Sequence, residues 1–483
     1  MGKAAAPAHV LVFPWPIQGH LNAMLHLAVA LAGAGVHVTF LHTDYNLRRL
    51  GAAAAAVASP WLRFMSVPDG LPDDHPRTVA DLGEIGRSIR TAGRAAYRAL
   101  LASLQLMPVD AAGGGFPPVT TVVADALLPF ATDVAEEFGV PALAFRTASA
   151  CSFLAYMSVP RLVELGELPF PPGGDLDEPV RGVPGMEGFL RRRDLPSPCR
   201  HHGANNDTAA LLGRLVNAAL HSSKARALIL NTATSLEAPA LAHIAPRMRD
   251  VFAVGPLHAM SPAPAVATSL WREDDGCMAW LDGQADRSVV YVSLGSLTVI
   301  SLEQFTEFLS GLVAAGYPFL WVLRPDMVMA SQSTTNLHEA VMAAGKNSKA
   351  RVAEWAPQRD VLRHRAVGCF LTHAGWNSTL EAAVEGVPTV CWPFFADQQI
   401  NSRFVGGVWR TGLDMKDVCD AAVVERMVRE AMESGEIRGS AQAVARQLRR
   451  DIAEGGSSAM ELERLVAFIR ELVMPIQHAE SEL

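Results

Sequence analysis

Strand and helix patterns alternate along this chain, and that alternation restricts its fold more than any other feature of the sequence. Near the amino terminus an apolar run, HVLVF (residues 9–13), is followed by a Pro/Gly loop, a helical stretch and a second apolar run, VHVTFLH (residues 36–42). The same order recurs in TTVVADALLPFATDVAEEFGVPALAF (residues 120–145). Strands that alternate with helices form a parallel sheet covered by helices on both faces. The sequence therefore predicts an α/β fold with a doubly wound sheet.

A second series of the same kind begins after a stretch rich in Pro, Ala and Ser. SVVYVSLGS (residues 288–296) and FLWVL (residues 319–323) have the composition of buried strands, and the helix between them is expected to begin at Ser301, with Gln304 at capping-box spacing. GCFLT and TVCWP add further strands. A chain of 483 residues is also too long for one hydrophobic core. The segments we expect are a first domain at residues 1–257, a linker at 258–270, a second domain at 271–460, and a terminal helix at 461–483 that packs back on the first domain.

The charge and cysteine content exclude several classes of partner and site. The chain has 41 basic and 49 acidic side chains, a net charge of −8 and no long basic run, so we expect no binding to nucleic acid or to an anionic membrane surface. Its six cysteines are scattered without a Cys-x-x-Cys pair, which predicts neither a disulfide framework nor a zinc site. The sequence contains no apolar run long enough for a transmembrane segment and no secretory pattern at its start, and we expect a cytoplasmic protein.

The stretch FLTHAGWNSTLEAAVEG (residues 370–386) carries more polar groups than a buried strand and its following helix require. The predicted strand ends at Thr372, and the helix is expected to begin near Ser378. A helix amino terminus beyond the carboxyl end of a parallel strand attracts anions, because its free N–H groups point at the ligand. Ser378 and Glu381 also have capping-box spacing, so local capping is the alternative. Capping does not explain the remaining polar residues of the loop, His373, Trp376 and Asn377.

These residues belong to WAPQRDVLRHRAVGCFLTHAGWNSTLEAAVEGVPTVCWPFFADQ (residues 355–398), which closely resembles the signature box of the plant UDP-dependent glycosyltransferases. FPWPIQGHLN, VVADALLPFATDVAEEFGVP and VYVSLGS are similar to other segments of that family. The resemblance implies an inverting family 1 enzyme with the GT-B fold, in which two Rossmann-like domains face each other across a cleft. It implies that the first domain binds the acceptor and the second the UDP-sugar, with no cofactor and no metal site. We expect the chain to act as a monomer.

The resemblance also implies how the box would hold the nucleotide. Trp355 would stack on uracil, because the flat base matches the face of an indole ring. The backbone at Ala356 and Gln358 would meet the edge of the base. Glu381 would accept hydrogen bonds from both ribose hydroxyls. In that family, the residues found here at Trp376 and at the final position of the box, Gln398, go with glucose, so UDP-glucose is the expected donor.

Diphosphate and sugar are expected beyond the strand ends, near helix amino termini. By resemblance, the residues at the diphosphate would be Ser296, His373, Gly375, Asn377 and Ser378. Those around the sugar would be Thr147, Trp376, Asp397 and Gln398. For Thr147 the sequence alone supports a role in the core or as a helix cap equally well.

Transfer of a sugar to a hydroxyl needs a base that removes the hydroxyl proton during attack on the anomeric carbon. His20 is the candidate, because it follows Gly19 between a predicted strand and helix. By resemblance, Asp125 would accept a hydrogen bond from the other ring nitrogen of His20, which fixes the tautomer and stabilises the imidazolium. A structural role is the alternative for a glycine-flanked histidine taken alone.

The acceptor is predicted less closely than the donor, and transfer to a carboxyl group of the acceptor is the alternative to transfer to a hydroxyl. Leu127, Tyr156 and Phe395 are candidates to line its pocket and imply a small hydrophobic molecule. VPDGLPDDHPR and VPGMEGFLRRRDLP are similar to segments of relatives that act on terpenoid, iridoid or cyanohydrin acceptors, and phenolic acceptors are also open. We interpret residues 171–208 as loops over the cleft, with the three arginines at 191–193 as a solvated face.

Three alternatives to this assignment stay open at this point. The first is the same fold with another UDP-sugar as donor. The second is a dinucleotide oxidoreductase or sugar-nucleotide epimerase, which needs Gly-x-Gly-x-x-Gly between the first strand and helix. GAGVHV (residues 33–38) instead follows a helix and lacks the third glycine. The third is a binding protein that keeps the nucleotide site without transferring a sugar.

Overall fold

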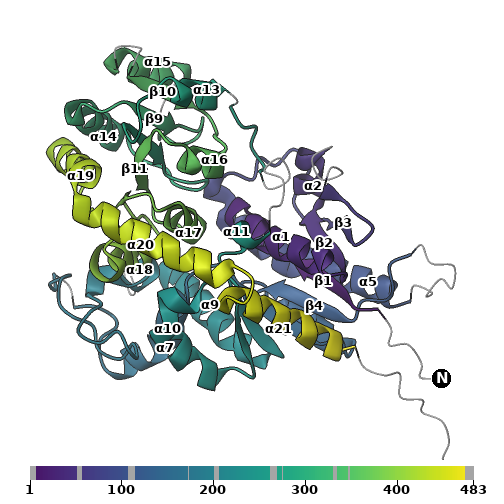
Figure 1. Cartoon of the computed structure of the whole chain (residues 1–483). Helices are drawn as coiled ribbons and strands as arrows, with labels where there is room; N and C mark the ends of the chain where they lie inside the picture. Colours follow the sequence, from purple (N-terminus) through teal and green to yellow (C-terminus); the bar gives the residue numbers. More distant parts are fainter. Residues whose placement is uncertain are drawn as a thin grey trace, which may run out of the picture.

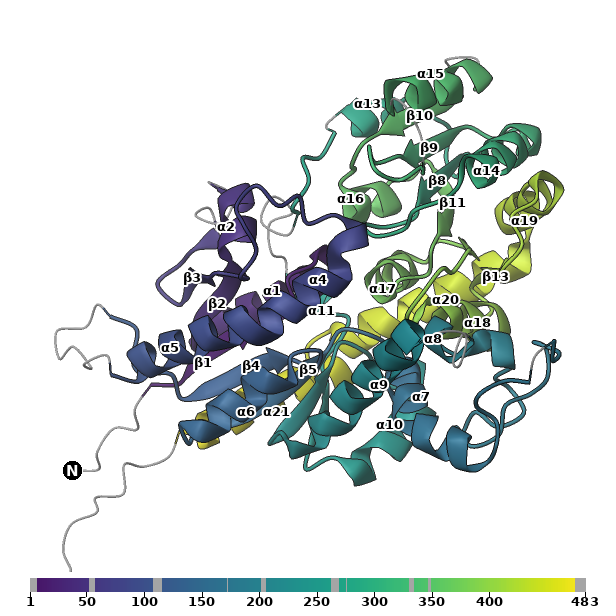
Figure 2. The same cartoon turned by 180° about the vertical axis from the view of Figure 1, so that it is seen from behind.

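The apolar runs form the strands of two wholly parallel sheets, which lie in separate lobes coloured purple to teal and green in Figures 1 and 2. The structure is a computed structural model and describes residues 7–51, 57–106, 115–171, 173–200, 206–261, 269–274, 276–329, 334–345 and 349–473. The first sheet has the order β3-β2-β1-β4-β5-β6-β7. Its strands are β1 (His9–Phe13), β2 (His37–Thr43), β3 (Leu62–Val67), β4 (Thr121–Asp125), β5 (Ala142–Arg146), β6 (Ala227–Leu230) and β7 (Val251–Ala253).

The second sheet has the order β10-β9-β8-β11-β12-β13, and again every pair of neighbours is parallel. Its strands are β8 (Val289–Ser293), β9 (Phe319–Val322), β10 (Ala350–Ala353), β11 (Val367–Thr372), β12 (Thr389–Cys391) and β13 (Gly412–Asp414). The predicted pair of doubly wound α/β sheets is therefore confirmed.

Helices connect successive strands and cover both faces of each sheet. In the first lobe they are α1 (Gln18–Gly33), α2 (Asp44–Leu50), α4 (Leu82–Ser88), α5 (Arg94–Gln105), α6 (Pro129–Glu137), α7 (Ala150–Glu164), α8 (Ser197–Arg200), α9 (Asn206–His221), α10 (Thr234–Ile244) and α11 (Leu257–Met260). In the second they are α13 (Gly276–Asp282), α14 (Leu302–Ala315), α15 (Thr334–Ala344), α16 (Gln358–Arg363), α17 (Trp376–Glu385), α18 (Gln398–Phe404) and α19 (Ala421–Glu433). The predicted capping box of α14 is confirmed, because the Ser301 hydroxyl accepts from the Gln304 N–H and the Gln304 side chain accepts from the Ser301 N–H.

Each sheet is buried on both faces, which is why its central strands are continuous apolar runs. Successive side chains of a strand point to opposite faces. In β1, Val10 and Val12 pack into one core, and Leu11 and Phe13 pack into another on the opposite face. The strand β8 divides its side chains between two cores in the same way. The carboxyl ends of both sheets are thereby held by packing on two sides, which fixes the loops that leave them.

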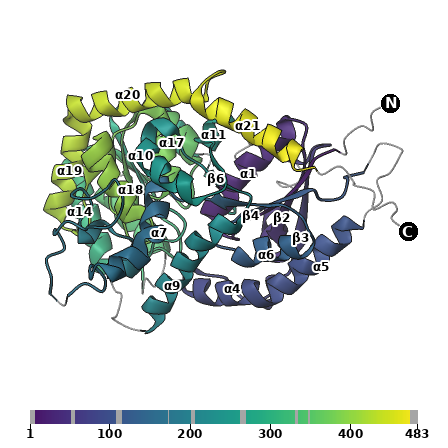
Figure 3. The same ribbon diagram turned by 90° about the horizontal axis from the view of Figure 1, so that it is seen from below.

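Two long helices at the carboxyl terminus join the lobes. Figure 3 shows α20 (Gly435–Ile452) and α21 (Ser457–Glu471) along one side of the molecule, where they pass from the second lobe to the first. Leu465, Val466 and Ile469 of α21 are buried in the core on one face of the first sheet. The division expected at residue 460 falls inside α21. None of the helices in the described part of the chain is long and apolar enough to cross a membrane.

The expected linker and the connecting segment 171–208 are more structured than the sequence indicated. Residues 258–260 lie in α11, whereas residues 262–268 of the linker and residues 474–483 of the terminal segment lie outside the described residues. The interpretation of 191–193 as a solvated face is wrong. Arg191 pairs with Asp194 and with Asp414 of the second lobe, and Arg193 pairs with Asp417. Asp414 and Asp417 are more than 200 positions away in the sequence, so local charge composition could not indicate them.

Candidate active site

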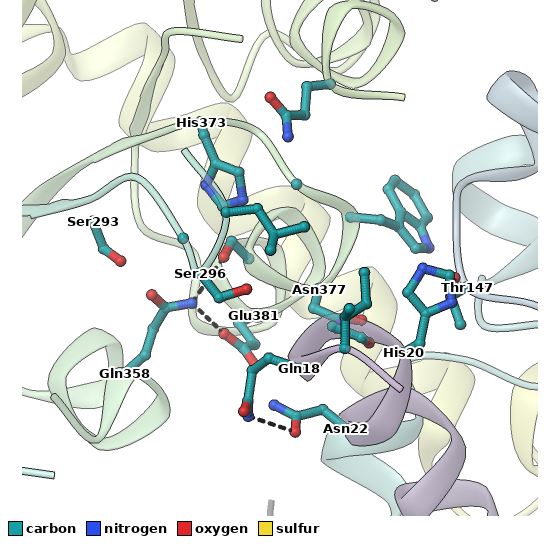
Figure 4. A pocket seen from close by; sticks show the side chains of 18 of the residues that line it. Gln18, His20, Asn22, Thr147, Ser293, Ser296, Gln358, His373, Asn377 and Glu381 are labelled. Atoms are coloured by element: carbon teal, nitrogen blue, oxygen red, sulfur yellow. Dashed lines mark hydrogen bonds between the residues drawn. The ribbon is translucent and has the colours of Figure 1, made fainter. Parts of the chain in front are cut away.

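Loops from the carboxyl ends of both sheets enclose one cavity of about 500 Å³. The first sheet contributes residues that follow β1, β4 and β5, and the second contributes residues that follow β8, β10, β11 and β12. Figure 4 shows His20 and Thr147 at one end of this cavity and Gln358 and Ser293 at the other. The cavity therefore lies where open parallel sheets bind their ligands, with each lobe supplying one side.

His20 and Asp125 meet at the end of the cavity formed by the first lobe. His20 is in the first turn of α1 and Asp125 is the last residue of β4, the strand beside β1. Nδ1 of His20 lies 2.5 Å from Oδ2 of Asp125. A carboxylate only accepts hydrogen bonds, so Nδ1 carries the proton in this pair and Nε2 of the neutral ring keeps its lone pair. This is the tautomer that a general base needs.

Asp125 is buried but held in its ionised form. Burial alone would raise its pKa, yet the charge and hydrogen bond of His20 and the backbone N–H groups of Leu127 and Trp15 hold the pKa below its usual value. The side chain is 1% exposed, whereas His20 is 15% exposed and faces the cavity. The Thr147 hydroxyl lies 3.1 Å from Nδ1 of the same ring. Ser149, rather than Thr147, caps α7, so the alternative of a capping role for Thr147 is wrong.

The loop between β11 and α17 is shaped around His373. α17 begins at Trp376, two residues before the predicted start, and its N-cap is Gly375. A Cβ on Gly375 would lie 2.4 Å from Nε2 of His373, and one on Gly295 would lie equally close, so both positions need glycine. Burial, with a smaller contribution from the nearby Arg324, lowers the pKa of His373 to about 4, although a hydrogen bond to the Ser293 backbone opposes the shift. His373 is therefore a neutral ring beside the amino terminus of α17 at physiological pH.

Ser378 and Glu381 do not form the capping box that was the alternative reading of their spacing. Instead the side-chain amide of Gln358 donates to the Ser378 hydroxyl at 2.9 Å and to the Glu381 carboxylate at 2.7 Å. The hydroxyl of Tyr291 donates to the other end of the Gln358 amide at 3.3 Å. Burial raises the pKa of Glu381 to about 7, although Gln358 and the Arg359 charge oppose the shift. Glu381 is thus a hydrogen-bond acceptor whose charge depends on pH in the neutral range.

Several predicted donor residues already have partners across the two lobes. The indole N–H of Trp376 donates to the Asn231 backbone oxygen at 2.8 Å, and the side-chain amide of Asn377 donates to the Gly19 backbone oxygen at 2.7 Å. Gly19 directly precedes His20, so this bond ties the amino terminus of α17 to the first turn of α1, which carries the candidate base. The candidate diphosphate-binding end of α17 and the candidate base His20 therefore lie next to each other.

The end of the box forms a tight turn before α18. The Gln398 side-chain oxygen accepts from the backbone N–H groups of Phe394 and Phe395. The Asp397 carboxylate accepts from the Asn401 amide at 2.9 Å. Burial raises the pKa of Asp397, while Asn401 and the nearby charges oppose the shift. This turn therefore presents Asp397 and Phe395 to the cavity.

Every residue predicted to contact donor or acceptor lines this cavity, and Asp125 lies behind His20. Their roles toward a ligand stay predictions. At the predicted base site, the indole of Trp355 is half-buried and stacks on Trp271, with the ring centroids 5.9 Å apart. The sequence did not indicate several further polar residues that line the cavity, among them Gln18, Asn22, Arg146, Ser293 and Arg359. A signal existed for Gln18 and Asn22, which flank His20 on one helix, and for Arg146, a charged residue that ends a buried strand.

Residues 117–431 match the model of the family described as UDP-glucoronosyl and UDP-glucosyl transferase. The chain is 43% identical to the myricetin 3-O-rhamnoside 1,2-glucosyltransferase of Crocosmia x crocosmiiflora, over 98% of both chains. It is 41% identical to a 7-deoxyloganetic acid glucosyltransferase of Catharanthus roseus, over 96% of this chain and 98% of that one. The crystal structure of Os79 from O. sativa in complex with UDP is similar, with a TM-score of 0.78 and 29% identity over 95% of this chain and all of that one.

Proposed function

The chain belongs to the UDP-glycosyltransferase family and is an enzyme of that family with the GT-B fold, and on this premise we propose that it transfers glucose from UDP-glucose to a small hydrophobic plant metabolite. Transfer is to a hydroxyl group and inverts the anomeric carbon. The observation that carries this proposal is the His20–Asp125 pair, whose ring opens into the same cavity as the amino terminus of α17. A base and an anion-binding helix end in one cavity are what a displacement of diphosphate by a hydroxyl requires.

In the proposed reaction, His20 takes the proton of the acceptor hydroxyl through Nε2 as the oxygen attacks the anomeric carbon. Asp125 keeps the ring oriented and stabilises the imidazolium that forms. The bond between the anomeric carbon and the UDP oxygen breaks on the opposite side, which inverts the configuration. The N–H groups at the start of α17, with His373, Asn377, Ser378 and Ser296, would stabilise the charge that develops on the diphosphate. These groups can supply that stabilisation without a metal ion, and we propose that the enzyme needs none.

The nature of the acceptor is inferred from its side of the cavity and from the relatives. Leu127, Tyr156 and Phe395 give that side an apolar surface. Two of the relatives are a 7-deoxyloganetic acid glucosyltransferase, which is 41% identical to this chain, and a (R)-mandelonitrile beta-glucosyltransferase, which is 36% identical. We therefore propose a terpenoid, iridoid or phenolic acceptor. We further propose that the enzyme acts as a monomer in the cytoplasm, where UDP-sugars are the donor pool.

An assay of donor and acceptor together tests this function. The purified chain would be incubated with UDP-glucose, UDP-galactose or UDP-glucuronate and a panel of phenols, terpenols and small hydroxy acids, with UDP release and product mass as readouts. Reactions without acceptor separate transfer from hydrolysis of the donor. We expect acceptor-dependent UDP release that is fastest with UDP-glucose, and a product heavier by one hexosyl unit. Faster use of another UDP-sugar would overturn the donor, and no acceptor-dependent release with any donor would overturn the function.

A further inference from the structure

Arg146 is a buried charge in the cavity, and two of its nitrogen atoms have no hydrogen-bond partner among the described residues. It is the last residue of β5, directly before Thr147, and it lines the cavity although it is only 5% exposed. Its Nε and Nη1 atoms are buried, and no acceptor in the described ranges takes a hydrogen bond from them. No carboxylate of those ranges forms an ion pair with it. A buried, unpaired guanidinium costs free energy, so its presence here points to a ligand that supplies the acceptor atoms.

A second unpartnered donor lies next to Arg146. Tyr156, from the second turn of α7, is 1% exposed, and its ring centroid lies 5.7 Å from Cζ of Arg146. The Tyr156 hydroxyl is buried and has no hydrogen-bond partner among the residues that the structure describes. Tyr156 also lines the cavity. Two neighbouring groups, a guanidinium and a phenol, therefore both line this end of the cavity and both carry donors that no described residue uses.

The nearby carboxylate of Asp397 does not accept a hydrogen bond from the buried donors of Arg146 and Tyr156. Asp397 is close enough for Arg146 and His20 to oppose the rise in its pKa that burial causes. Its carboxylate nevertheless accepts from Asn401 and is not in ion-pair contact with Arg146. In the proposed reaction Asp397 holds hydroxyls of the sugar, which engages it further. The positive charge of Arg146 therefore stays available to a substrate.

We propose that Arg146 and Tyr156 form an anion subsite that binds a carboxylate carried by the acceptor. This inference rests on the proposed glucosyl transfer and specifies its acceptor as a hydrophobic hydroxy acid. The carboxylate is the anchor and not the nucleophile: a separate hydroxyl of the acceptor forms the new bond to the anomeric carbon, its proton goes to His20, and UDP leaves. A planar guanidinium binds a carboxylate through two parallel hydrogen bonds, which would fix the direction of the acceptor as well as its affinity.

A carboxylate at this place could also belong to the donor, as in a UDP-uronate. Two observations favour the acceptor. Arg146 and Tyr156 both come from the first lobe, where Tyr156 and Phe153 provide aromatic surface beside the guanidinium. Asp397 lies on the side where the sugar is expected, and its carboxylate would repel the carboxylate of a uronate sugar.

Binding measurements on matched acceptors test the subsite. An aromatic, a cinnamic and a monoterpenoid hydroxy acid, each beside its methyl ester, would be titrated by calorimetry into the enzyme saturated with UDP, at a pH where the acids are ionised. We expect at least one acid to bind about tenfold or more tightly than its ester, as a charge-assisted hydrogen-bonded pair implies. In Arg146→Met this preference for the acid should disappear, Arg146→Lys should keep part of it, and Tyr156→Phe should reduce it.

The outcomes separate this inference from the proposed function. Equal binding of acid and ester by the parent, for all three pairs, would overturn the subsite, and so would an acid preference that survives in Arg146→Met. Binding of UDP to each variant reports whether its donor site is folded. Faster turnover of UDP-glucuronate than of UDP-glucose by the parent, lost in Arg146→Met, would overturn the acceptor assignment in favour of a donor carboxylate. Failure to transfer glucose to any acceptor would count against the proposed function, whereas the binding comparison would still decide the subsite.

Discussion

The affinity of the enzyme for UDP-glucose should depend on pH through Glu381. Burial raises the pKa of this carboxyl to about 7 in the free enzyme, and ribose hydroxyls can donate to it fully only when it is ionised. Binding should therefore lower its pKa and release a proton, so affinity rises with pH and levels off above the free-enzyme pKa. His373, with a pKa of about 4, stays neutral over the same range.

The size of the effect follows from the pKa. If only the ionised form binds, the apparent Kd is multiplied by 1 + 10^(pKa − pH), and a pKa of about 7 makes this factor about 11 at pH 6 and about 1.1 at pH 8. UDP-glucose should thus bind about tenfold, or roughly 1.4 kcal/mol, more weakly at pH 6 than at pH 8. Its diphosphate is substituted at both ends and does not titrate here, unlike the terminal phosphate of UDP, whose pKa is about 6.

Calorimetry on His20→Ala would measure this, because we expect that variant to bind the donor without turning it over. The variant also removes His20, which lines the cavity together with His373. Glu381→Gln in the same background is the control. It should bind UDP-glucose more weakly at pH 8 and show no change between pH 6 and 8. A change of less than about twofold in the parent background, or the same slope in the Glu381→Gln control, would refute the reasoning.

Three further predictions concern the base, the sugar and the contact between the lobes. Asp125→Asn should reduce transfer by about a hundredfold or more, measured as kcat with UDP-glucose, because the amide neither selects the tautomer nor stabilises the imidazolium. Asp397→Ala should weaken use of UDP-glucose by about 1 to 3 kcal/mol while UDP affinity stays close to that of the parent, and a chelator should change neither. A parallel loss of UDP affinity, or inhibition by the chelator, would contradict this. Lys416→Met should lower the free energy of urea unfolding by about 2 kcal/mol, because Asp194 is fully buried and Lys416 lies 2.8 Å from it. The matched control Arg363→Met, at an exposed pair, should stay within about 0.5 kcal/mol, and equal effects would remove the buried pair from its role.

The central strands could be predicted from the sequence and the edge strands could not. β1, β4, β8 and β11 are covered on both faces, so burial forces an apolar run that stands out. Three of the edge strands, β3, β10 and β13, are short or carry half-buried polar residues such as Arg63 and Arg351, and their pairing depends on a neighbouring strand rather than on their own pattern.

The positions of the candidate site were predictable, but most of their contacts were not. In a parallel sheet all strands end at the same edge, so the loops that follow them meet there. The site residues of the segment 355–398 and His20 therefore lie in one cavity. Which group each side chain contacts depends on distances between segments that the sequence does not contain. Gln358 holds Glu381 with its side chain, and Trp376 donates to a backbone oxygen of the other lobe. Arg146 stands out only in the structure, where two of its buried nitrogen atoms have no hydrogen-bond partner among the described residues.

The central claim is that one cavity binds the donor with the second lobe and activates the acceptor with His20. The most direct test measures UDP affinity by calorimetry and glucosyl transfer by product formation on His20→Ala beside the parent. We expect a UDP Kd within about twofold of the parent and transfer reduced by about a hundredfold or more, the scale of general base catalysis. Transfer by the variant at the rate of the parent, with UDP bound equally well, would contradict it.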